Sequence, residues 1–372
     1  MVNLSKAFLI ESEKELGEYR LSPSKNDSDF LVQWVPKDPS ISILFVQAAL
    51  SGAEKTGFDC RKILTDAKIE PELLNEPQAR VSPDQYTRLI QTLWLTMNDE
   101  FIGLAKNKSP LGSFAMMCLS IVHCKTLYQA IKRGARFGKL SLGELDLRLE
   151  VKGEVAILSL HLKDPTVDPT HFLSECLLVI MHRLYCWMIG KRIILDKALF
   201  NYSQPAHVNE YYGLFCRKLS FDQEITGLQF NRRYLDMPVV QDERSLKEYF
   251  KLAPANLVTR PQYDDSFTAK VRALVNQSDS AIFPTLEAVA AQMYTTPSTL
   301  RRNLKKENSS YQEIKDAIRR DISIHLLAET NLPLQAIAEK LGYTEASTFQ
   351  HTFKKWVGIA PGAYRGKLNE DK

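Results

Sequence analysis

Two short stretches near the end of the chain place hydroxyl, amide and basic side chains at the spacing of one helix face. The first stretch offers Ser298, Thr299, Arg301, Arg302 and Lys305. The second offers Ser347, Thr348, Gln350, His351 and Lys354. An arginine can bind O6 and N7 of guanine with two hydrogen bonds, whereas a lysine at the edge of such a helix suits a backbone phosphate. We therefore expect these ten residues to bind double-stranded DNA, with Lys354 on phosphate.

A repeated pattern of apolar residues predicts the elements that hold these side chains. Residues 286–293 and 334–341 both place apolar residues at i, i+3, i+4 and i+7, the pattern of a helix with one buried face. A short turn follows each copy, with Gly342 suited to a left-handed helix end, and then a second helix at 298–306 or 347–355. This is the helix-turn-helix plan. One polar helix face alone is explained equally well as solvated surface, but two copies with matched buried positions favour DNA recognition.

The stretch between the two copies, 311–329, predicts one continuous helix with Arg319 and Arg320 on its outer side. Its apolar residues recur at every fourth position, at Ile314, Ile318, Ile322 and Leu326. Nineteen residues span about 28 Å as an α-helix, and successive major grooves on one face of DNA lie about 34 Å apart. We expect this helix to hold the two recognition helices about one DNA turn apart.

The charge distribution agrees with a DNA-binding C-terminal part. Residues 266–372 contain 15 Lys and Arg against 11 Asp and Glu, so this stretch carries the whole net charge of +4. A basic surface is the usual electrostatic footprint of phosphate binding. A basic excess of this size also arises by chance, so the charge supports the DNA-binding interpretation of the repeats but does not establish it.

Helical and alternating patterns mixed together predict an α+β domain over residues 39–251. The expected helices span 41–52, 59–67, 82–97, 126–137 and 172–189, and Ser82 with Pro83 suits a helix start. Strict alternation on both sides of Lys152-Gly153 predicts a β-hairpin of 144–151 and 154–162, and a short strand is expected at 192–195. We expect residues 1–38 to be flexible, 252–265 to be a linker, and 266–367 to form the all-α DNA-binding domain.

Composition and motifs argue against several other classes of protein. Apolar content of 44% and charged content of 25% are typical of a soluble globular protein, and no apolar run approaches the length of a membrane helix. Six scattered cysteines without a CxxC pair indicate reduced thiols and a cytoplasmic location. The chain has no GxSxG, Walker or HExxH motif, so we expect no enzymatic activity and no cofactor.

Two clusters of potential metal ligands have simpler interpretations. The first cluster lies around a proline-containing loop and comprises His161, Asp164, Asp168 and His171. We interpret these as surface turn residues. The second cluster comprises Cys118, His123 and Cys124 in an apolar stretch, where cysteine behaves as a small hydrophobic residue. We expect no metal site at either place.

The C-terminal motifs resemble the DNA-binding domain of the AraC/XylS family of bacterial transcription regulators. The matching residues are Ile337-Ala338, Leu341-Gly342-Tyr343, Ser347, Phe349, Phe353-Lys-Lys355, Gly358, Pro361 and Tyr364-Arg365. The N-terminal part is similar, more loosely, to the arabinose-binding-type regulatory domain of one branch of that family. Those matches are Leu111-Gly-Ser-Phe114, Thr126-Leu-Tyr-Gln-Ala-Ile131, Tyr211-Tyr-Gly-Leu-Phe215, Phe221 and Leu228-Gln-Phe230. The resemblance implies a cytoplasmic regulator that senses a small molecule, usually activates a nearby operon, and often forms a homodimer. RNA polymerase is a candidate partner.

The chain departs from the family pattern at two positions. His351 stands where members usually have Arg, and a neutral histidine cannot make the forked contact to guanine. Ser323 stands where the helix between the two copies usually has Ala, with little expected effect. The Pro-Cys-His-Arg motif of DNA-repair methyltransferases that carry a similar domain is absent.

The effector and its pocket are not identified by the sequence. The apolar helix 172–189 is compatible with a core element, a pocket wall or an interface. An alternative is therefore a DNA-binding regulator whose N-terminal domain only dimerises or binds a protein partner.

Overall fold

The computed structural model describes residues 39–141, 145–251, 267–276, 283–307 and 309–366. The segments expected to be flexible (1–38) and to form the linker (252–265) lie outside these residues. Contacts divide the described chain into two compact units. Unit 1 contains residues 47–63 and 89–251, and unit 2 contains residues 39–46, 64–88 and 267–366. Two short N-terminal stretches thus belong to the unit that holds the expected DNA-binding domain.

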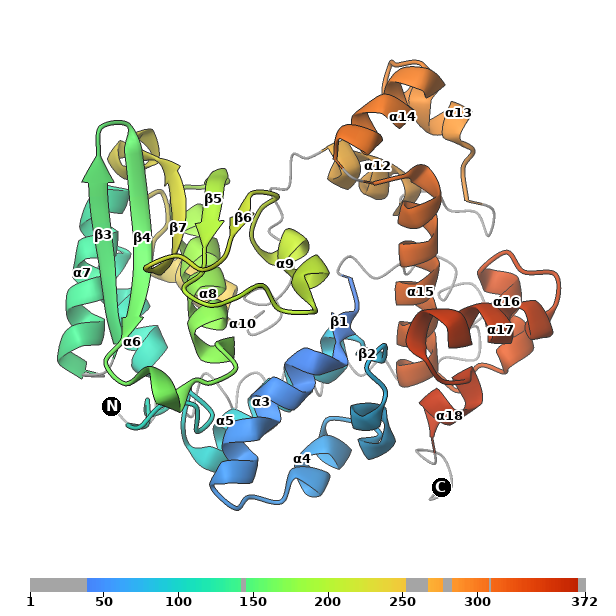
Figure 1. Ribbon diagram of the computed structural model, residues 1–372, viewed down its shortest axis with the longest axis horizontal. Helices are drawn as coiled ribbons and strands as arrows, with labels where there is room; N and C mark the ends of the chain where they lie inside the picture. Colours follow the sequence, from blue (N-terminus) through green and yellow to red (C-terminus); the bar gives the residue numbers. More distant parts are fainter. Residues whose placement is uncertain (1–38, 142–144, 252–266, 277–282, 308, 367–372) are drawn as a thin grey trace. The chain divides into compact units, whose positions relative to one another are not determined.

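Unit 1 is built around a five-stranded sheet with the order β3-β4-β7-β5-β6 (Figure 1). Its strands are β3 (Leu145–Lys152), β4 (Val155–Leu162), β5 (Leu195–Leu199), β6 (Leu219–Ser220) and β7 (Thr226–Asn231). The neighbouring strands are antiparallel except for β5 and β6. Lys152 pairs with Val155, and Gly153 between them has φ of +58°, which confirms the predicted hairpin. The strand expected at 192–195 instead begins at its last residue, Leu195.

Helices cover the sheet and complete the core of unit 1. These are α6 (Ser113–Ile121), α7 (Leu127–Ser141), α8 (Phe172–Met188), α9 (Val208–Leu214) and α10 (Glu243–Lys251). Short 3-10 helices lie at η2 (Pro165–Val167) and η3 (Arg232–Asp236). Helix α7 packs along β3, and α8 packs along β4 and β7. Thirteen of the seventeen residues of α8 are buried, so it is mainly a core element.

Three further helices are divided between the two units. They are α3 (Ile43–Lys55), α4 (Cys60–Asp66) and α5 (Pro83–Met97), and each has residues in both units. All three agree with the predicted helices to within a few residues. The Ser82 hydroxyl accepts a hydrogen bond from the Gln85 amide at 3.1 Å, which confirms the cap expected before Pro83.

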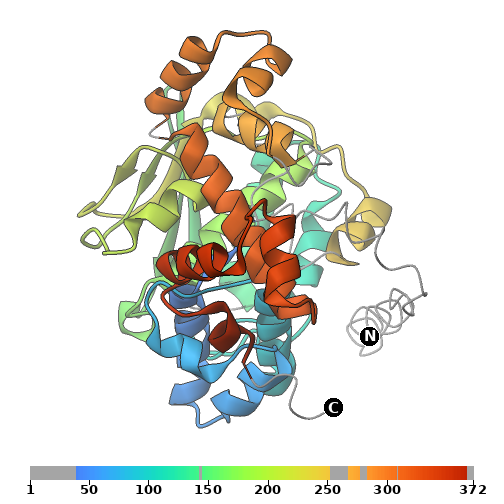
Figure 2. The same ribbon diagram turned by 90° about the vertical axis from the view of Figure 1, so that its right-hand side faces the viewer.

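Unit 2 consists mainly of helices, with a two-stranded sheet of β1 (Ile41–Ser42) and β2 (Arg80–Val81) and the 3-10 helix η1 (Pro71–Asn75). The C-terminal helices are α12 (Phe267–Asn276), α13 (Leu286–Gln292), α14 (Pro297–Lys306), α15 (Tyr311–Glu329), α16 (Leu334–Lys340), α17 (Ala346–Val357) and α18 (Pro361–Arg365). Figure 2 shows α15 running from the α12–α14 group to the α16–α18 group. The two predicted helix-turn-helix pairs and the single connecting helix are confirmed.

Each helix-turn-helix pair has its own apolar core. The first is formed from α12 to α15 by residues that include Val271, Val289, Leu300, Leu304 and Ile318. The second buries Ile337, Ala338, Phe349, Phe353 and Tyr364. The small side chains of Ala290 and Ala338 are 1% and 0% exposed, as expected where two helices approach closely. Because the regularly spaced apolar residues of each repeat lie on the buried side of its helices, the opposite side of each helix can carry polar residues.

Candidate nucleic-acid interface

Helix α14 presents its polar residues on the side away from the core. The hydroxyl of Thr296 accepts a hydrogen bond from the amide of Thr299 at 3.2 Å, and Pro297 is the first helical residue. At about 100° per residue, Ser298, Arg301, Arg302 and Lys305 share one side, opposite Leu300 and Leu304. All four side chains are exposed, whereas Thr299 is half-buried at the flank. The structure thus brings the first set of predicted residues onto one surface.

Helix α17 repeats this arrangement with different side chains. Ser347, Thr348, Gln350, His351 and Lys354 are all exposed, and Phe349 and Phe353 on the opposite side are fully buried. The Ser347 hydroxyl donates to the Glu345 carboxylate at 3.0 Å. The second set of predicted residues therefore shares a surface of α17 that corresponds to the surface of α14.

The turns before the two helices differ in a way that the sequence pattern did not indicate. Gly342 has φ of +77° in the second turn, as expected for a left-handed helix end. The equivalent residue in the first turn, Tyr294, has φ of +50° and is 99% exposed. A left-handed conformation costs a non-glycine residue about 1 kcal/mol. The exposed Tyr294 therefore adds a hydroxyl-bearing side chain next to α14. In the sequence, only the alignment of Tyr294 with Gly342 could have indicated its left-handed conformation.

Arg319 and Arg320 of α15 are half-buried rather than on an outer side, so the expectation for them was wrong. The Arg319 guanidinium lies 4.8 Å from the ring centre of Phe283 and 5.5 Å from that of Tyr343. Its Nε also donates to the carbonyl of Leu341 at 3.2 Å. Because Phe283 precedes α13 and Tyr343 precedes α17, Arg319 contacts both helix-turn-helix pairs and helps to fix α15 between them.

A buried carboxylate on α15 holds the neighbouring elements of unit 2. Asp321 accepts from Arg272 of α12 at 2.6 Å and from the amide and hydroxyl of Ser40 at 3.1 and 2.6 Å. Arg320 lies 3.4 Å away. Burial alone would raise the pKa of Asp321, but the charges of Arg320 and Arg272 and the bond from Ser40 hold this pKa below its ordinary value. Asp321 is therefore an ionised, buried tie between α12, α15 and the N-terminal stretch.

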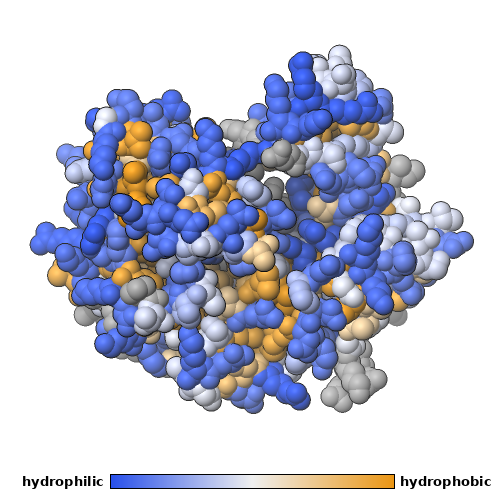
Figure 3. All heavy atoms as spheres, in the orientation of Figure 1, coloured by the Kyte–Doolittle hydropathy of each residue, from blue (hydrophilic) through white to orange (hydrophobic). Residues whose placement is uncertain are grey.

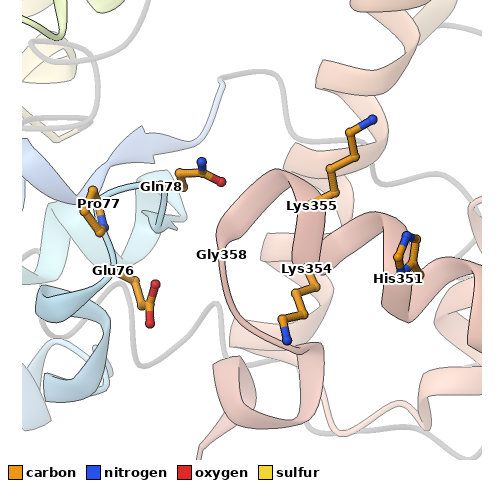
Figure 4. Close-up of a pocket in the computed structure, with 7 residues that line it drawn as sticks. All are labelled: Glu76, Pro77, Gln78, His351, Lys354, Lys355 and Gly358. Carbon is orange, nitrogen blue, oxygen red and sulfur yellow. The ribbon is translucent and has the colours of Figure 1, made fainter.

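The surface over the first recognition helix suits a polar ligand. Figure 3 shows a mainly hydrophilic face over α13 and α14. Beside the second recognition helix, a shallow groove is lined by Glu76, Pro77, Gln78, His351, Lys354, Lys355 and Gly358 (Figure 4). Two predicted DNA contacts, His351 and Lys354, thus border a segment from the N-terminal part of unit 2.

The residues first considered as metal ligands have local partners. His161 lies 3.0 Å from the Ser159 hydroxyl, and Asp164 accepts from Thr166. Asp168 accepts from the amides of Leu173 and Ser174 at the start of α8. Asp168 is only 1% exposed, so its interpretation as a surface turn residue was wrong. Within the ranges that the structure describes, no three His, Cys, Asp or Glu side chains are grouped as a metal site.

No helix in the described part of the chain has the length and apolar character needed to cross a membrane. This finding concerns only those residues.

Comparison with known proteins gives matches over both units. A model of the N-terminal arabinose-binding domain of AraC transcription regulators matches residues 57–239, and a helix-turn-helix domain model matches residues 289–367. The chain is 23% identical over 342 residues to the ornithine utilization regulator of Pseudomonas aeruginosa, which covers 92% of this chain and 99% of that protein. It is 26% identical over 328 residues to an uncharacterized HTH-type transcriptional regulator of Mycobacterium tuberculosis, covering 84% and 92%. Among solved structures, the transcriptional regulator CdpR of Pseudomonas aeruginosa matches 76% of this chain and 87% of its own, with 20% identity and a TM-score of 0.26.

Two helix-turn-helix pairs on one connecting helix, together with a separate α+β unit, define a bipartite DNA-binding regulator of transcription. The chain belongs to the AraC family of transcription regulators and has an N-terminal domain of the arabinose-binding type. The family resemblance of the sequence motifs is thereby confirmed.

Proposed function

We propose that this regulator activates transcription of a nearby operon in the cytoplasm when its N-terminal regulatory domain, residues 39–251, binds a small-molecule effector. The DNA-binding domain of residues 266–367 follows a linker at 252–265. The urease operon transcriptional activator of Escherichia coli, 22% identical over 181 residues, supports the activating role. A homodimer and a contact with RNA polymerase belong to the same proposal.

The observation that carries the DNA-binding part is the pair of exposed polar faces on α14 and α17. They stand at equivalent places of two repeats joined by a helix of 19 residues. Such a helix is about 28 Å long, which is close to the ~34 Å between successive major grooves. We assign most of the sequence readout to α14, because Arg301 and Arg302 can each make forked contacts with guanine. His351 gives α17 a weaker means of base readout.

The test begins with selection of bound sites from random DNA by the full chain. Arg302→Ala should then lower affinity for the selected operator by about 1–3 kcal/mol and relax specificity at one base pair. Arg136→Ala removes the same charge from an exposed position on α7 of unit 1 and serves as the matched control. Equal affinities of the two variants in a gel-shift titration at fixed salt would reject the role of Arg302.

The effector part needs a separate measurement. Because relatives include regulators of ornithine utilization and of a urease operon, the first panel is ornithine, related amino acids and urea. A ligand that binds the folded state and not the unfolded chain raises the melting temperature of the protein. The same ligand should also raise expression from a reporter that carries the selected operator. If no compound of the panel changes reporter expression, and the protein purifies as a dimer or in a stable complex with a protein partner, the dimerisation or partner-binding alternative is favoured.

A further inference from the structure

Among the described residues, strand β3 is an end member of the five-stranded sheet of unit 1 (Figure 1). It pairs with β4 over all eight of its residues without a register shift, and it contains no proline. The strand at the other end of the sheet, β6, has only two residues. Proteins commonly keep edge strands short or irregular, because a long regular edge can pair with a strand of another chain. Of the two edges of this sheet, β3 is therefore the one suited to extension.

The pairing of the inner strands determines which backbone groups of β3 face this edge. The amide of Arg232 donates to the carbonyl of Glu154 at 2.9 Å, so the backbone of Glu154 faces the β7 side of β4. Because the backbone groups of successive residues point to opposite sides of a strand, Val155 faces β3, and its partner Lys152 faces β4. The same alternation turns the N–H and C=O groups of Leu149, and of the residues two positions before and after it, toward the edge.

The apolar face of β3 is incompletely covered. Leu147, Leu149 and Val151 lie on the same side of the sheet as their three partners on β4, which are at most 8% exposed. In contrast, Leu147 and Leu149 are half-buried, and Val151 is 40% exposed. A further strand along this edge would cover these three side chains and remove apolar surface from water.

The other face of β3 carries charges that alternate in sign. They are, in order, Asp146, Arg148, Glu150 and Lys152. Arg148 lies 2.8 Å from Asp146, and Lys152 lies 3.5 Å from Glu150. The side chains of Arg148, Glu150 and Lys152 are 53%, 52% and 79% exposed, so they are accessible to a partner strand. Such an alternating series is complementary to an antiparallel copy of itself, because opposite charges on facing strands attract.

One register of an antiparallel copy satisfies the charges, the apolar side chains and the backbone together. When Leu149 lies opposite Leu149 of a second copy, Asp146 faces Lys152 and Arg148 faces Glu150. Residues whose backbone points to the edge then face each other, as exchanged backbone hydrogen bonds require. A copy displaced by two residues places Arg148 opposite its own copy or opposite Lys152, which brings like charges together. The charge pattern therefore selects the register centred on Leu149.

We propose that two copies of this chain dimerise by antiparallel pairing of β3 with β3, centred on Leu149, so that their sheets form one continuous sheet. The inference rests on the homodimer of the proposed function and specifies its interface. A second copy is the partner because residues 146–152 are complementary to themselves in charge and in apolar side chains. A dimer carries two DNA-binding domains, and this linkage raises affinity for an operator that contains two sites.

The first test uses the two-fold symmetry of the pairing. Residue 149 lies opposite its own copy, with Cα atoms about 5.5 Å apart, which is within the range of a disulfide. Residue 147 is four positions away from its own copy along the strand, or about 14 Å. Oxidation of the full chain with diamide should therefore cross-link Leu149→Cys into a covalent dimer. Leu147→Cys should show only the background of the wild type, which has six cysteines of its own.

The second test exchanges charges across the interface. Arg148→Glu and Glu150→Arg each place like charges opposite each other twice in the dimer. Each should raise the dissociation constant of the dimer about tenfold or more, measured by sedimentation equilibrium. In an equimolar mixture of the two variants, opposite charges face each other again, so a heterodimer should form with nearly the affinity of the wild-type dimer. Lys247→Glu reverses a charge at an exposed position of α10 and is the control, with dimerisation expected to equal that of the wild type.

Several results would overturn the proposal. Equal cross-linking of Leu149→Cys and Leu147→Cys would refute the register. A mixture of Arg148→Glu and Glu150→Arg that stays monomeric would show that these positions do not face each other. If each of these two variants dimerises as tightly as Lys247→Glu, the dimer forms at another surface, and the homodimer of the proposed function stands without this interface. A monomeric wild type would reject the interface and the homodimer together, while operator selection by that monomer would leave the DNA-binding part of the proposed function intact.

Discussion

Replacing Asp321 by Asn tests whether one buried carboxylate holds unit 2 together. The Asp321 side chain is 2% exposed and pairs with Arg272, which is 14% exposed. Removing one partner of a buried pair typically costs about 3–5 kcal/mol, because the remaining charge is left without compensation. Arg320 is 25% exposed and can turn toward water, and the Asn oxygen still accepts from Ser40. We therefore expect Asp321→Asn to lower the free energy of unfolding of unit 2 by about 2–3 kcal/mol at pH 7.

The pH dependence gives this prediction a second signature. The pKa of Asp321 in the folded protein lies below the ordinary value of 3.8. Its contribution is therefore fully present above pH 3.8 and is lost as the pH falls through the folded pKa. The difference between wild type and Asp321→Asn should be largest at neutral pH and should shrink in strong acid.

The assay is hydrogen exchange at α12 and α15, combined with calorimetric unfolding of the full chain at several pH values. Asp316→Asn is the matched control, because Asp316 lies on the same helix, is 39% exposed and pairs with Arg319 at 3.8 Å. A surface pair of this kind contributes about 0–1 kcal/mol. An effect of Asp321→Asn no larger than that of the control, or one that does not change with pH, would refute the reasoning.

Three further predictions concern DNA binding, the core and unit 1. Lys354→Ala should weaken binding to all DNA sequences alike and lower the salt slope by about 0.9; a loss confined to one sequence would contradict a phosphate contact. Leu304→Ala, at a side chain 1% exposed, should cost about 2–5 kcal/mol, measurable by urea unfolding. Burial raises the pKa of Glu175 to about 7 although Tyr202 and Tyr211 donate to it. Because this pKa is raised, the protonated carboxyl stabilises the fold below pH 4.5, and this contribution is lost as the pH rises through about 7. Glu175→Gln should therefore make the melting temperature of unit 1 less dependent on pH across that range. A pH profile identical to that of the wild type would count against this prediction.

Local periodicity predicted most of the helical part of the fold. Helices α13 to α17 lie where the apolar repeats placed them, because a buried stripe at helical spacing has few other solutions. The hairpin β3-β4 followed from alternation around Gly153. Strand β5 was misplaced by about three residues because its position depends on pairing with β7 and β6, which no local pattern records.

The candidate site was predictable where it depends on helix faces and not where it depends on distant contacts. The exposure of Arg301, Arg302 and Gln350 follows from the spacing of the buried positions in the same helices. The burial of Arg319 depends on Phe283 and Tyr343, far away in sequence. The groove between residues 76–78 and α17 could not have been anticipated, because nothing near residue 76 marks it as a neighbour of α17.

The hydrogen bonds between Ser40 and Asp321 join residues 281 positions apart in sequence. During synthesis, the N-terminal stretches of unit 2 leave the ribosome long before α15 exists, while unit 1 is already complete enough to fold. Closing so long a loop adds little free-energy cost, since each doubling of length costs about 0.6 kcal/mol, but non-local contacts of this kind slow folding. Unit 2 is therefore assembled only after α15 has been synthesised, later and more slowly than a helix-turn-helix domain made from one continuous stretch of chain.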